Sequence, residues 1–382
     1  MKNFQEKIYD LKDKGRYRSL SLPQGIDLTS NDYLGLVNDP YLKNAALEFL
    51  QQNDQIGSGG SRLLRGHTAS HDALERFAAV FFVAPKALYF STGFQANQAI
   101  FQALPSRHDT IIFDEFVHAS AREAIQKSHA RHIKVRHNAL QGFENAIKEA
   151  IASERAHIWV VVESVYSMDG DLAPLAGIYA LVRQYPNITL IVDEAHATAV
   201  LGTDGKGLAY DLYSTGRMPD NLITLHTCGK ALGVAGGLVC GSHDVVDMLV
   251  NTARAFIYST APMPLQAYLV QKALEFVASD DGAARRDRLK NLSKKAQQLF
   301  GGAGTHIVPL IIGDDARAVY AAKMLQHKGW DIRAIRPPTV PDGTARLRLS
   351  LSANLDEDTL ENFAADFNNI KPLAGVAAES HD

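Results

Sequence analysis

Short apolar runs alternate with longer segments of helical periodicity through most of the chain. Seven runs have the length and apolar content of strands, and most are separated by segments with the 3.6-residue period of a helix. They cover residues 87–91, 109–114, 132–136, 157–163, 190–196, 222–226 and 236–241. This alternation predicts an α/β fold with a mostly parallel central sheet that helices cover.

The pattern changes near Pro262 and Pro264, where two long helical stretches begin. Three short strand-like runs and one helix follow, which predicts a smaller C-terminal α+β domain. We therefore expect four parts: an N-terminal helix and arm at 1–37, a large domain at 38–270, the small domain at 271–372 and a disordered tail at 373–382.

Composition narrows the class of protein. The chain has 382 residues, 46% of them hydrophobic, and a net charge of −3, so no basic surface favours nucleic acid or anionic lipid. Two cysteines cannot build a disulfide framework or a four-cysteine metal site, and we expect no metal. No apolar run approaches the roughly 20 residues of a membrane helix. We expect a cytoplasmic protein.

Lys230 follows the run at 222–226 and small residues, at what we expect to be the end of a buried strand. A surface lysine is the more common interpretation of such a position, but a desolvated ammonium tends to lose its proton and become a nucleophile. Asp193 and His196 close another apolar run. Lysine, carboxylate and imidazole at neighbouring strand ends are what pyridoxal phosphate chemistry requires.

A second candidate is the turn at 91–100, which follows a strand and opens a helix. Gly93 and Phe94 would present backbone N–H groups to an anion, although an ordinary capped turn gives the same pattern. There is no G-x-G-x-x-G run and no P-loop, so a nucleotide-binding dehydrogenase is disfavoured. His118 follows the next strand, where it caps a helix or stacks on a flat ring.

Two arginine-bearing segments are candidates for anion binding. The glycine-rich segment Gly57–His67 is either a flexible loop or a loop that faces substrate or crosses to another subunit. Arg346 and Arg348 alternate on a strand and therefore share a face, which suits a carboxylate.

Together these motifs resemble the α-oxoamine synthases, which are fold-type I pyridoxal phosphate enzymes. The resemblance spans nearly the whole chain, through the runs SNDYLGL, GSGGSRLL, STGFQANQA, YSMDGD, DEAH, TCGK, IYST and PPTVPDGTARLRLS. One departure is Ala199, which stands where relatives carry a glycine. A non-catalytic relative would be expected to lack Lys230, so that alternative is disfavoured.

The resemblance implies roles for individual residues. Lys230 would bind pyridoxal 5'-phosphate covalently, Asp193 would pair with the pyridine nitrogen, and His118 would stack on the ring. His196 and Ser167 would contact the phenolic oxygen. The phosphate would be held by Gly93, Phe94 and Thr227, and by Ser259 and Thr260 of a partner subunit in a homodimer. The substrate contacts would be Arg18, Asn31, His118, Thr339 and Arg348.

The implied activity is a decarboxylative condensation of an amino acid with an acyl thioester. The run PPTVPDGTARLRL favours L-alanine and a pimeloyl thioester, the biotin-forming branch of the family, with the pimeloyl group on CoA or on acyl carrier protein. The sister activities, which join glycine with acetyl-CoA or succinyl-CoA, or serine with palmitoyl-CoA, are the alternatives.

Overall fold

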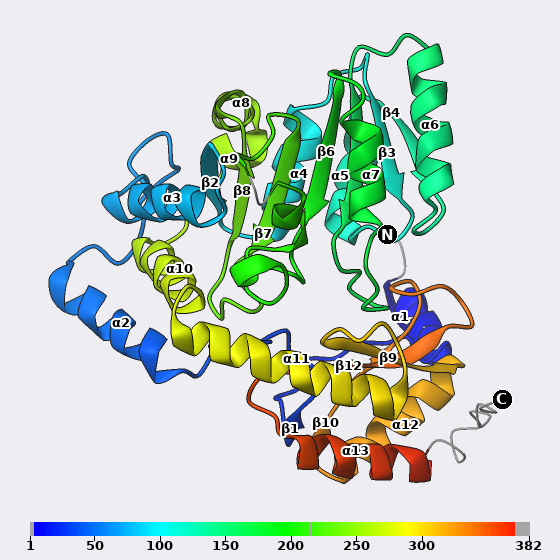
Figure 1. Ribbon diagram of the computed structural model, residues 1–382. Helices are drawn as coiled ribbons and strands as arrows, with labels where there is room; N and C mark the ends of the chain where they lie inside the picture. Colours follow the sequence, from blue (N-terminus) through cyan, green and yellow to red (C-terminus); the bar gives the residue numbers. More distant parts are fainter. Residues whose placement is uncertain (1–3, 214–215, 371–382) are drawn as a thin grey trace. The chain divides into compact units, whose positions relative to one another are not determined.

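The computed structural model describes residues 4–213 and 216–370, which fold into two units (Figure 1). The first unit contains the described residues of Met1–Tyr33, Met168–Asp171 and Arg288–Asp382, and the second contains those of Leu34–Ser167 and Leu172–Asp287. The four-part division expected from the sequence stays a prediction, and its tail at 373–382 lies outside the described residues.

A seven-stranded sheet forms the centre of the second unit, in the order β2-β8-β7-β6-β5-β3-β4. The strands β3 to β7 pair in parallel, and β8 runs antiparallel to both β7 and β2. Their bounds are β2 Lys86–Phe90, β3 Thr110–Asp114, β4 Arg131–Val135, β5 Ile158–Glu163, β6 Ile188–Asp193, β7 Leu222–Thr227 and β8 Gly237–Gly241. The predicted α/β fold with a mostly parallel sheet is confirmed.

Helices cover both faces of this sheet, which explains why β5 and β6 are buried along their whole length. Figure 1 shows α4 and α5 on one face and α7 on the other. On the first face, alternate strand residues such as Val161 and Ile191 pack against apolar residues of these helices. The helices of this unit are α2 Pro40–Gln52, α3 Ala69–Phe81, α4 Gly93–Ala103, α5 Ala119–Lys127, α6 Leu140–Ala152, α7 Leu175–Val182, α8 His243–Thr252, α9 Arg254–Ile257 and α10 Pro264–Val277.

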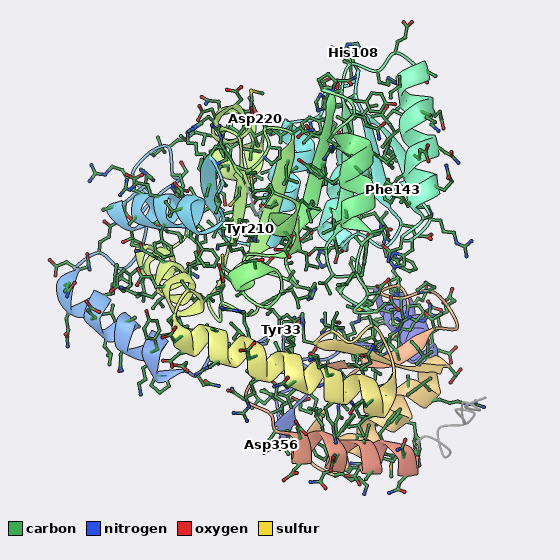
Figure 2. The ribbon with its side chains drawn as sticks, in the orientation of Figure 1. Tyr33, His108, Phe143, Tyr210, Asp220 and Asp356 are labelled. Carbon is green, nitrogen blue, oxygen red and sulfur yellow. The ribbon has the colours of Figure 1, made fainter. Side chains whose placement is uncertain are left out.

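The direction of the strands fixes where a ligand can bind. His108 and Asp220 lie just before β3 and β7, and Figure 2 shows both at the same end of the sheet. The carboxyl ends of the parallel strands therefore lie at the opposite edge. In open α/β sheets that edge is where ligands bind.

The first unit is built on a smaller antiparallel sheet in the order β11-β12-β9, next to a two-stranded sheet of β1 and β10. Its elements are α1 Phe4–Asp13, β1 Ile26–Asp27, β9 Ile307–Gly313, α12 Asp315–His327, β10 Trp330–Asp331, β11 Ala334–Ile335, β12 Ala345–Ser350 and α13 Glu357–Ile370. Helix α11, Asp280–Phe300, begins in the second unit and ends in the first. In the described ranges, no helix has the length and apolar content that crossing a membrane requires.

Arg62, in the glycine-rich segment, serves the second unit itself. Its guanidinium contacts both carboxylate oxygens of Glu75 at 3.0 Å and the carbonyl oxygen of Tyr89 at 3.2 Å. Glu75 also accepts a hydrogen bond from the Tyr89 backbone N–H at 2.8 Å. The Arg62 side chain is only 5% exposed. The interpretation of Arg62 as a group that binds a ligand anion is therefore wrong, because it pairs with an internal carboxylate.

Removing one partner of this buried pair should strongly destabilise the second unit. We expect Arg62→Ala to lower the free energy of unfolding by about 3–5 kcal/mol, because Glu75 would remain buried without its counter-charge. Arg76 and Asp72 on the same helix provide the control, since their side chains are 71% and 51% exposed. Arg76→Ala should cost less than about 1 kcal/mol. Urea unfolding followed by circular dichroism measures both, and equal losses would contradict the expectation.

Candidate active site

A cavity of about 140 Å³ opens at the carboxyl edge of β5, β6 and β7. Glu163 and Asp193 are the last residues of β5 and β6 and are paired across the parallel ladder, and Thr227 ends β7. The residues that line the cavity are Gly93, Phe94, Asn97, His118, Ser120, Glu163, Asp193, Ala195, His196, Thr227 and Lys230. The strand-end lysine, carboxylate and imidazole are thus brought into one site.

Lys230 and His196 are in direct contact. The Lys230 Nζ atom lies 2.8 Å from His196 Nε2, and both side chains belong to turns that follow strands. His196 is buried, whereas Lys230 is half-buried. The amine is therefore held at the wall of the cavity by an imidazole, with access to whatever the cavity binds.

A hydrogen-bond chain connects Asp193 with His118. The Asn97 Nδ2 group donates to Asp193 Oδ2 at 3.1 Å and to Ser120 Oγ at 2.9 Å. Ser120 Oγ lies 2.7 Å from His118 Nδ1. The second carboxylate oxygen of Asp193 accepts the Ala195 backbone N–H at 3.0 Å. Asp193 is therefore oriented by two neutral donors, which leave its negative charge available to a cation in the cavity.

The same chain of bonds sets the state of the His118 ring. His118 is the N-cap of α5, and its Nδ1 atom accepts the Ser120 backbone N–H at 3.2 Å. An Nδ1 atom that accepts carries no proton, so the proton of the neutral ring is on Nε2. Burial lowers the pKa of His118, and the positive charges of Lys230 and Arg122 lower it further, against the opposing effect of Asp193. The ring is therefore neutral near pH 7.

The start of α4 provides an anion-binding cradle. The hydroxyl of the N-cap residue Thr92 accepts a hydrogen bond from the Gln95 backbone N–H at 3.0 Å. The backbone N–H groups that come before Gln95 in the first turn have no carbonyl partner within the helix, as at any helix start. A Cβ atom on Gly93 would lie 2.6 Å from Thr227 Oγ1, and one on Gly237 would lie 2.8 Å from the Gly93 Cα atom. Glycine at both positions lets these segments pack closely, and the Thr227 hydroxyl therefore lies beside the start of α4.

Three predicted cofactor contacts lie elsewhere in the second unit. Ser167 is half-buried in the turn after β5 and is not among the cavity-lining residues of the described chain. Ser259 and Thr260 lie between α9 and α10, and Thr260 pairs with Ser61 in an isolated bridge. The Thr260 carbonyl oxygen lies 3.5 Å from Ser91 Oγ.

His226, which the sequence places beside the lysine segment, has a structural role. Its ring stacks on Phe82 with 3.7 Å between the ring centroids, and its two nitrogens lie 2.9 and 2.8 Å from the hydroxyl groups of Thr198 and Thr224. Burial lowers the pKa of His226 to about 3. A neutral histidine therefore ties the turn that carries His196 to strand β7.

Of the predicted substrate contacts, His118 lines the cavity of the second unit, and the other four lie in the first unit, where they form two pairs. Arg348 Nη2 donates to Asn31 Oδ1 at 3.1 Å and to the Tyr33 hydroxyl at 3.2 Å, and Arg348 Nη1 donates to Ser350 Oγ at 2.7 Å. Arg18 Nη2 lies 3.4 Å from Thr339 Oγ1.

Arg346, by contrast, is buried and bonds to the carboxylate of Asp169. Its interpretation as half of an arginine pair for a ligand carboxylate is therefore wrong.

The comparisons with known proteins agree with this geometry. The family model "Aminotransferase class I and II" matches residues 23–367. The 8-amino-7-oxononanoate synthase of Geobacter sulfurreducens is 38% identical over 389 residues, which cover 97% of this chain and 98% of the relative. The chain belongs to the 8-amino-7-oxononanoate synthases, within aminotransferase class I and II.

Two solved structures extend the similarity. The serine palmitoyltransferase of Sphingomonas wittichii has a TM-score of 0.85 and 27% identity, and the alignment covers 93% of this chain and 89% of that chain. The 8-amino-7-oxononanoate synthase of Francisella tularensis has a TM-score of 0.76 and 26% identity, with 91% and 98% covered. The fold-type I assignment is therefore confirmed.

The cofactor of this family is pyridoxal 5'-phosphate, and the residues present fit it. The cavity offers an amine for the aldehyde, a carboxylate for the pyridine nitrogen, and a helix start beside Thr227 for the phosphate. The sequence interpretation missed Asn97 and Ser120. Their only signal is position, since Asn97 lies one helical turn after Gly93 and therefore on the same face of α4.

Asn97 should contribute to cofactor binding through Asp193. We expect Asn97→Leu to weaken pyridoxal phosphate binding by roughly tenfold or more, because a hydrogen bond to a charged group is worth about 1.5–3 kcal/mol. Equilibrium titration of the apo chain, followed by absorbance, gives the dissociation constant. Asn145→Leu on the exposed face of α6 is the control. Unchanged affinity in the Asn97 variant would show that Asp193 needs no such donor.

Proposed function

We propose that this chain condenses L-alanine with a pimeloyl thioester and releases CO2 and the free thiol, giving 8-amino-7-oxononanoate. The product is the one that the relatives' name gives, over 97% of this chain in the Geobacter case, and the substrates are those that the resemblance implies. The type of chemistry is supported by one observation above all, the 2.8 Å contact of Lys230 with His196 at a cavity that also contains Asp193. The cytoplasmic location expected from the sequence stays a prediction.

Lys230 is proposed as the residue that bonds the cofactor aldehyde. With pyridoxal phosphate and alanine bound, the Lys230 amine would be the base that removes the proton from the alanine Cα atom. Bound pyridoxal phosphate supplies an electron sink for the electron pair left at that carbon. The Cα atom would then bond to the thioester carbonyl carbon, and the thiolate would leave and take a proton from solvent. The original carboxylate would depart as CO2, and the Lys230 ammonium would return its proton to the Cα atom.

Asp193 and His118 are proposed to hold the cofactor ring. Asp193 stabilises a protonated pyridine nitrogen, which keeps the ring electron-poor. His118 offers a flat, neutral ring that suits stacking, and the first turn of α4 with Thr227 suits the phosphate. His196 contacts the lysine amine directly, so it is also placed to accept or return a proton there.

The amino-acid carboxylate is assigned to Arg348, as the resemblance implies, with Asn31, Arg18 and Thr339 as further substrate contacts. The buried Arg348 guanidinium is oriented by neutral groups, namely the Asn31 amide oxygen and the hydroxyls of Tyr33 and Ser350. A guanidinium oriented in this way suits a planar carboxylate, which it can bind through two parallel hydrogen bonds.

A comparison of substrates tests the activity. L-alanine with pimeloyl-CoA or pimeloyl-acyl carrier protein should release thiol and CO2 faster than glycine with acetyl-CoA or succinyl-CoA, or serine with palmitoyl-CoA. In the same assay, Lys230→Ala should abolish turnover and fixation of the cofactor by borohydride. Arg348→Lys should raise the KM for alanine and leave the cofactor absorbance intact, because lysine keeps the charge and loses the planar fork. Fastest turnover of glycine with acetyl-CoA would exclude the proposed substrates.

A homodimer with shared sites is proposed as well. Ser259 and Thr260 lie outside the cavity of their own chain, as residues that serve the phosphate of a partner subunit would. Apolar side chains are exposed next to them, with Leu64 79% and Tyr258 73% exposed. Exposed large side chains of this kind are typical of subunit interfaces.

Mixing two inactive chains tests the shared site. Lys230→Ala lacks the lysine, and Thr260→Glu should repel the phosphate bound by its partner. In a heterodimer, the intact Lys230 of one chain meets the intact Thr260 of the other, so the mixture should recover part of the wild-type turnover. Each variant alone is the control. No recovery in a mixture that sedimentation shows to contain dimers would contradict the shared site.

A further inference from the structure

A buried histidine on helix α3 takes no part in the assigned chemistry. The other buried residues of this helix, Leu74, Ala78 and Phe81, are apolar, whereas His71 is polar and fully buried. A polar side chain inside the protein is costly unless its hydrogen bonds are made. The partners of His71 therefore show what it holds in place.

The His71 ring connects the start of α3 with the segment before α10. Its Nδ1 atom accepts the Thr68 backbone N–H at 3.2 Å and lies 2.8 Å from the Thr68 hydroxyl. An Nδ1 atom that accepts carries no proton, so the neutral ring has its proton on Nε2. Nε2 lies 2.9 Å from the Pro262 carbonyl oxygen and donates to it. Burial, with a smaller contribution from the charge of Arg62, lowers the pKa of His71 to about 4, so the ring is neutral near pH 7.

The glycine-rich segment holds the same stretch of chain. The Ser58 hydroxyl donates to the Pro262 carbonyl oxygen at 2.6 Å, so this oxygen accepts two hydrogen bonds. The Ala261 backbone N–H donates to the Gly60 carbonyl oxygen at 2.9 Å. A Cβ atom on Gly66 would lie 2.7 Å from the Ala261 Cβ atom, so the absence of a side chain there lets the two segments approach closely. Ala261 and Pro262 are thus fixed both by the glycine-rich segment and by α3.

Thr260 comes immediately before this fixed pair and is exposed, whereas Ala261 and Pro262 are buried. A rigid backbone beside an exposed threonine presents its hydroxyl at a defined place outside the cavity of its own chain. The proposed function gives this threonine, with Ser259, to the phosphate bound by a partner subunit. Such a contact benefits from a fixed backbone, because ordering a mobile segment on binding costs conformational entropy.

We propose that His71 is a positioning residue for cofactor binding, and that it acts on the site of the partner subunit. By donating to the Pro262 carbonyl, it holds Ser259 and Thr260 where they meet the phosphate in that site. The glycine-rich segment serves the same purpose through Ser58 and Gly60. The inference rests on the proposed function, because it needs pyridoxal phosphate in the cavity and a homodimer with shared sites.

A ligand without the phosphate separates this role from general damage to the cavity. We expect His71→Phe to raise the dissociation constant of the apo chain for pyridoxal phosphate by roughly tenfold, because the buried Pro262 carbonyl loses a donor. The dissociation constant for pyridoxal, which has no phosphate, should stay within about twofold of wild type, since no contact with the rest of the ligand changes. His71→Gln should bind pyridoxal phosphate within about threefold of wild type, because its amide N–H can donate to Pro262. Equal losses for both ligands in His71→Phe would contradict the proposal.

Two further variants complete this series. His243→Phe changes an exposed histidine at the start of α8 and is the matched control, which should bind both ligands as wild type does. Ser58→Ala removes the other donor to Pro262 and leaves α3 intact, so it tests the same role if His71→Phe does not fold. Its loss of affinity should also be confined to pyridoxal phosphate. Unchanged affinity for pyridoxal phosphate in every folded variant overturns the proposal.

Mixed dimers show on which subunit His71 acts. In a heterodimer of His71→Phe with Lys230→Ala, the intact lysine is in the chain with the changed histidine, and its site receives the Thr260 segment of the other chain, in which His71 is intact. At a cofactor concentration that leaves His71→Phe dimers mostly empty, borohydride should fix more cofactor per His71→Phe chain in the mixture than in that variant alone. No increase, when differently tagged chains copurify, would place the effect within one chain and sink the proposal.

The mixture of Lys230→Ala with Thr260→Glu distinguishes this inference from the proposed function. No recovery of turnover in that mixture overturns the shared site and the role of His71 with it. Recovery there, without an increase in the His71 mixture, overturns the role of His71 alone.

Discussion

The parallel pairing of β5 with β6 and of β6 with β7 is the constraint on which the site depends. The ladder places Glu163 opposite Asp193, and it places Asp193 opposite Leu225, two residues before the end of β7. Because parallel strands end at the same edge, residues far apart in the sequence meet there without any loop having to reach over. The contact of Lys230 with His196 then needs only the two short turns that follow β6 and β7. The buried His226 of β7 holds the turn that carries His196 through Thr198.

Much of this could be predicted from the sequence, because strand ends have a visible pattern. Apolar runs of strand length located the strands of the large sheet along the chain. The polar residues that follow or close these runs pointed to Lys230, Asp193, His196 and His118. The helix start at Gly93 could be located for a similar reason, because it follows a strand, although an ordinary capped turn gives the same sequence pattern. Ala199, the departure noted in the sequence, adopts a left-handed φ of 69°, which is the backbone conformation that the glycine of the relatives would adopt without strain.

What could not be predicted are pairings that depend on burial. In the sequence, Arg62 and Arg346 look like groups that bind a ligand anion. In the structure, Arg62 pairs with Glu75 and Arg346 pairs with Asp169. Nothing in the local sequence distinguishes an arginine that meets an internal carboxylate from one that meets a ligand. Asn97 was missed for the opposite reason, since a single amide on an amphipathic helix has no pattern of its own until the strand beside it is placed.

Glu163 and Asp193, the two acids at the carboxyl edge of the sheet, show how the fold gives two carboxyl groups different environments. Neighbouring parallel strands lie only about 4.8 Å apart, so two buried carboxylates at paired positions would repel each other strongly. Asp193 accepts hydrogen bonds from Asn97 and from the Ala195 N–H, whereas the Oε1 atom of Glu163 has no hydrogen-bond partner among the described residues. Burial and the negative charge of Asp193 raise the pKa of Glu163, which favours its neutral form. Two adjacent strand ends thus place carboxyl groups in different environments against one cavity, a difference that their positions in the sequence do not reveal.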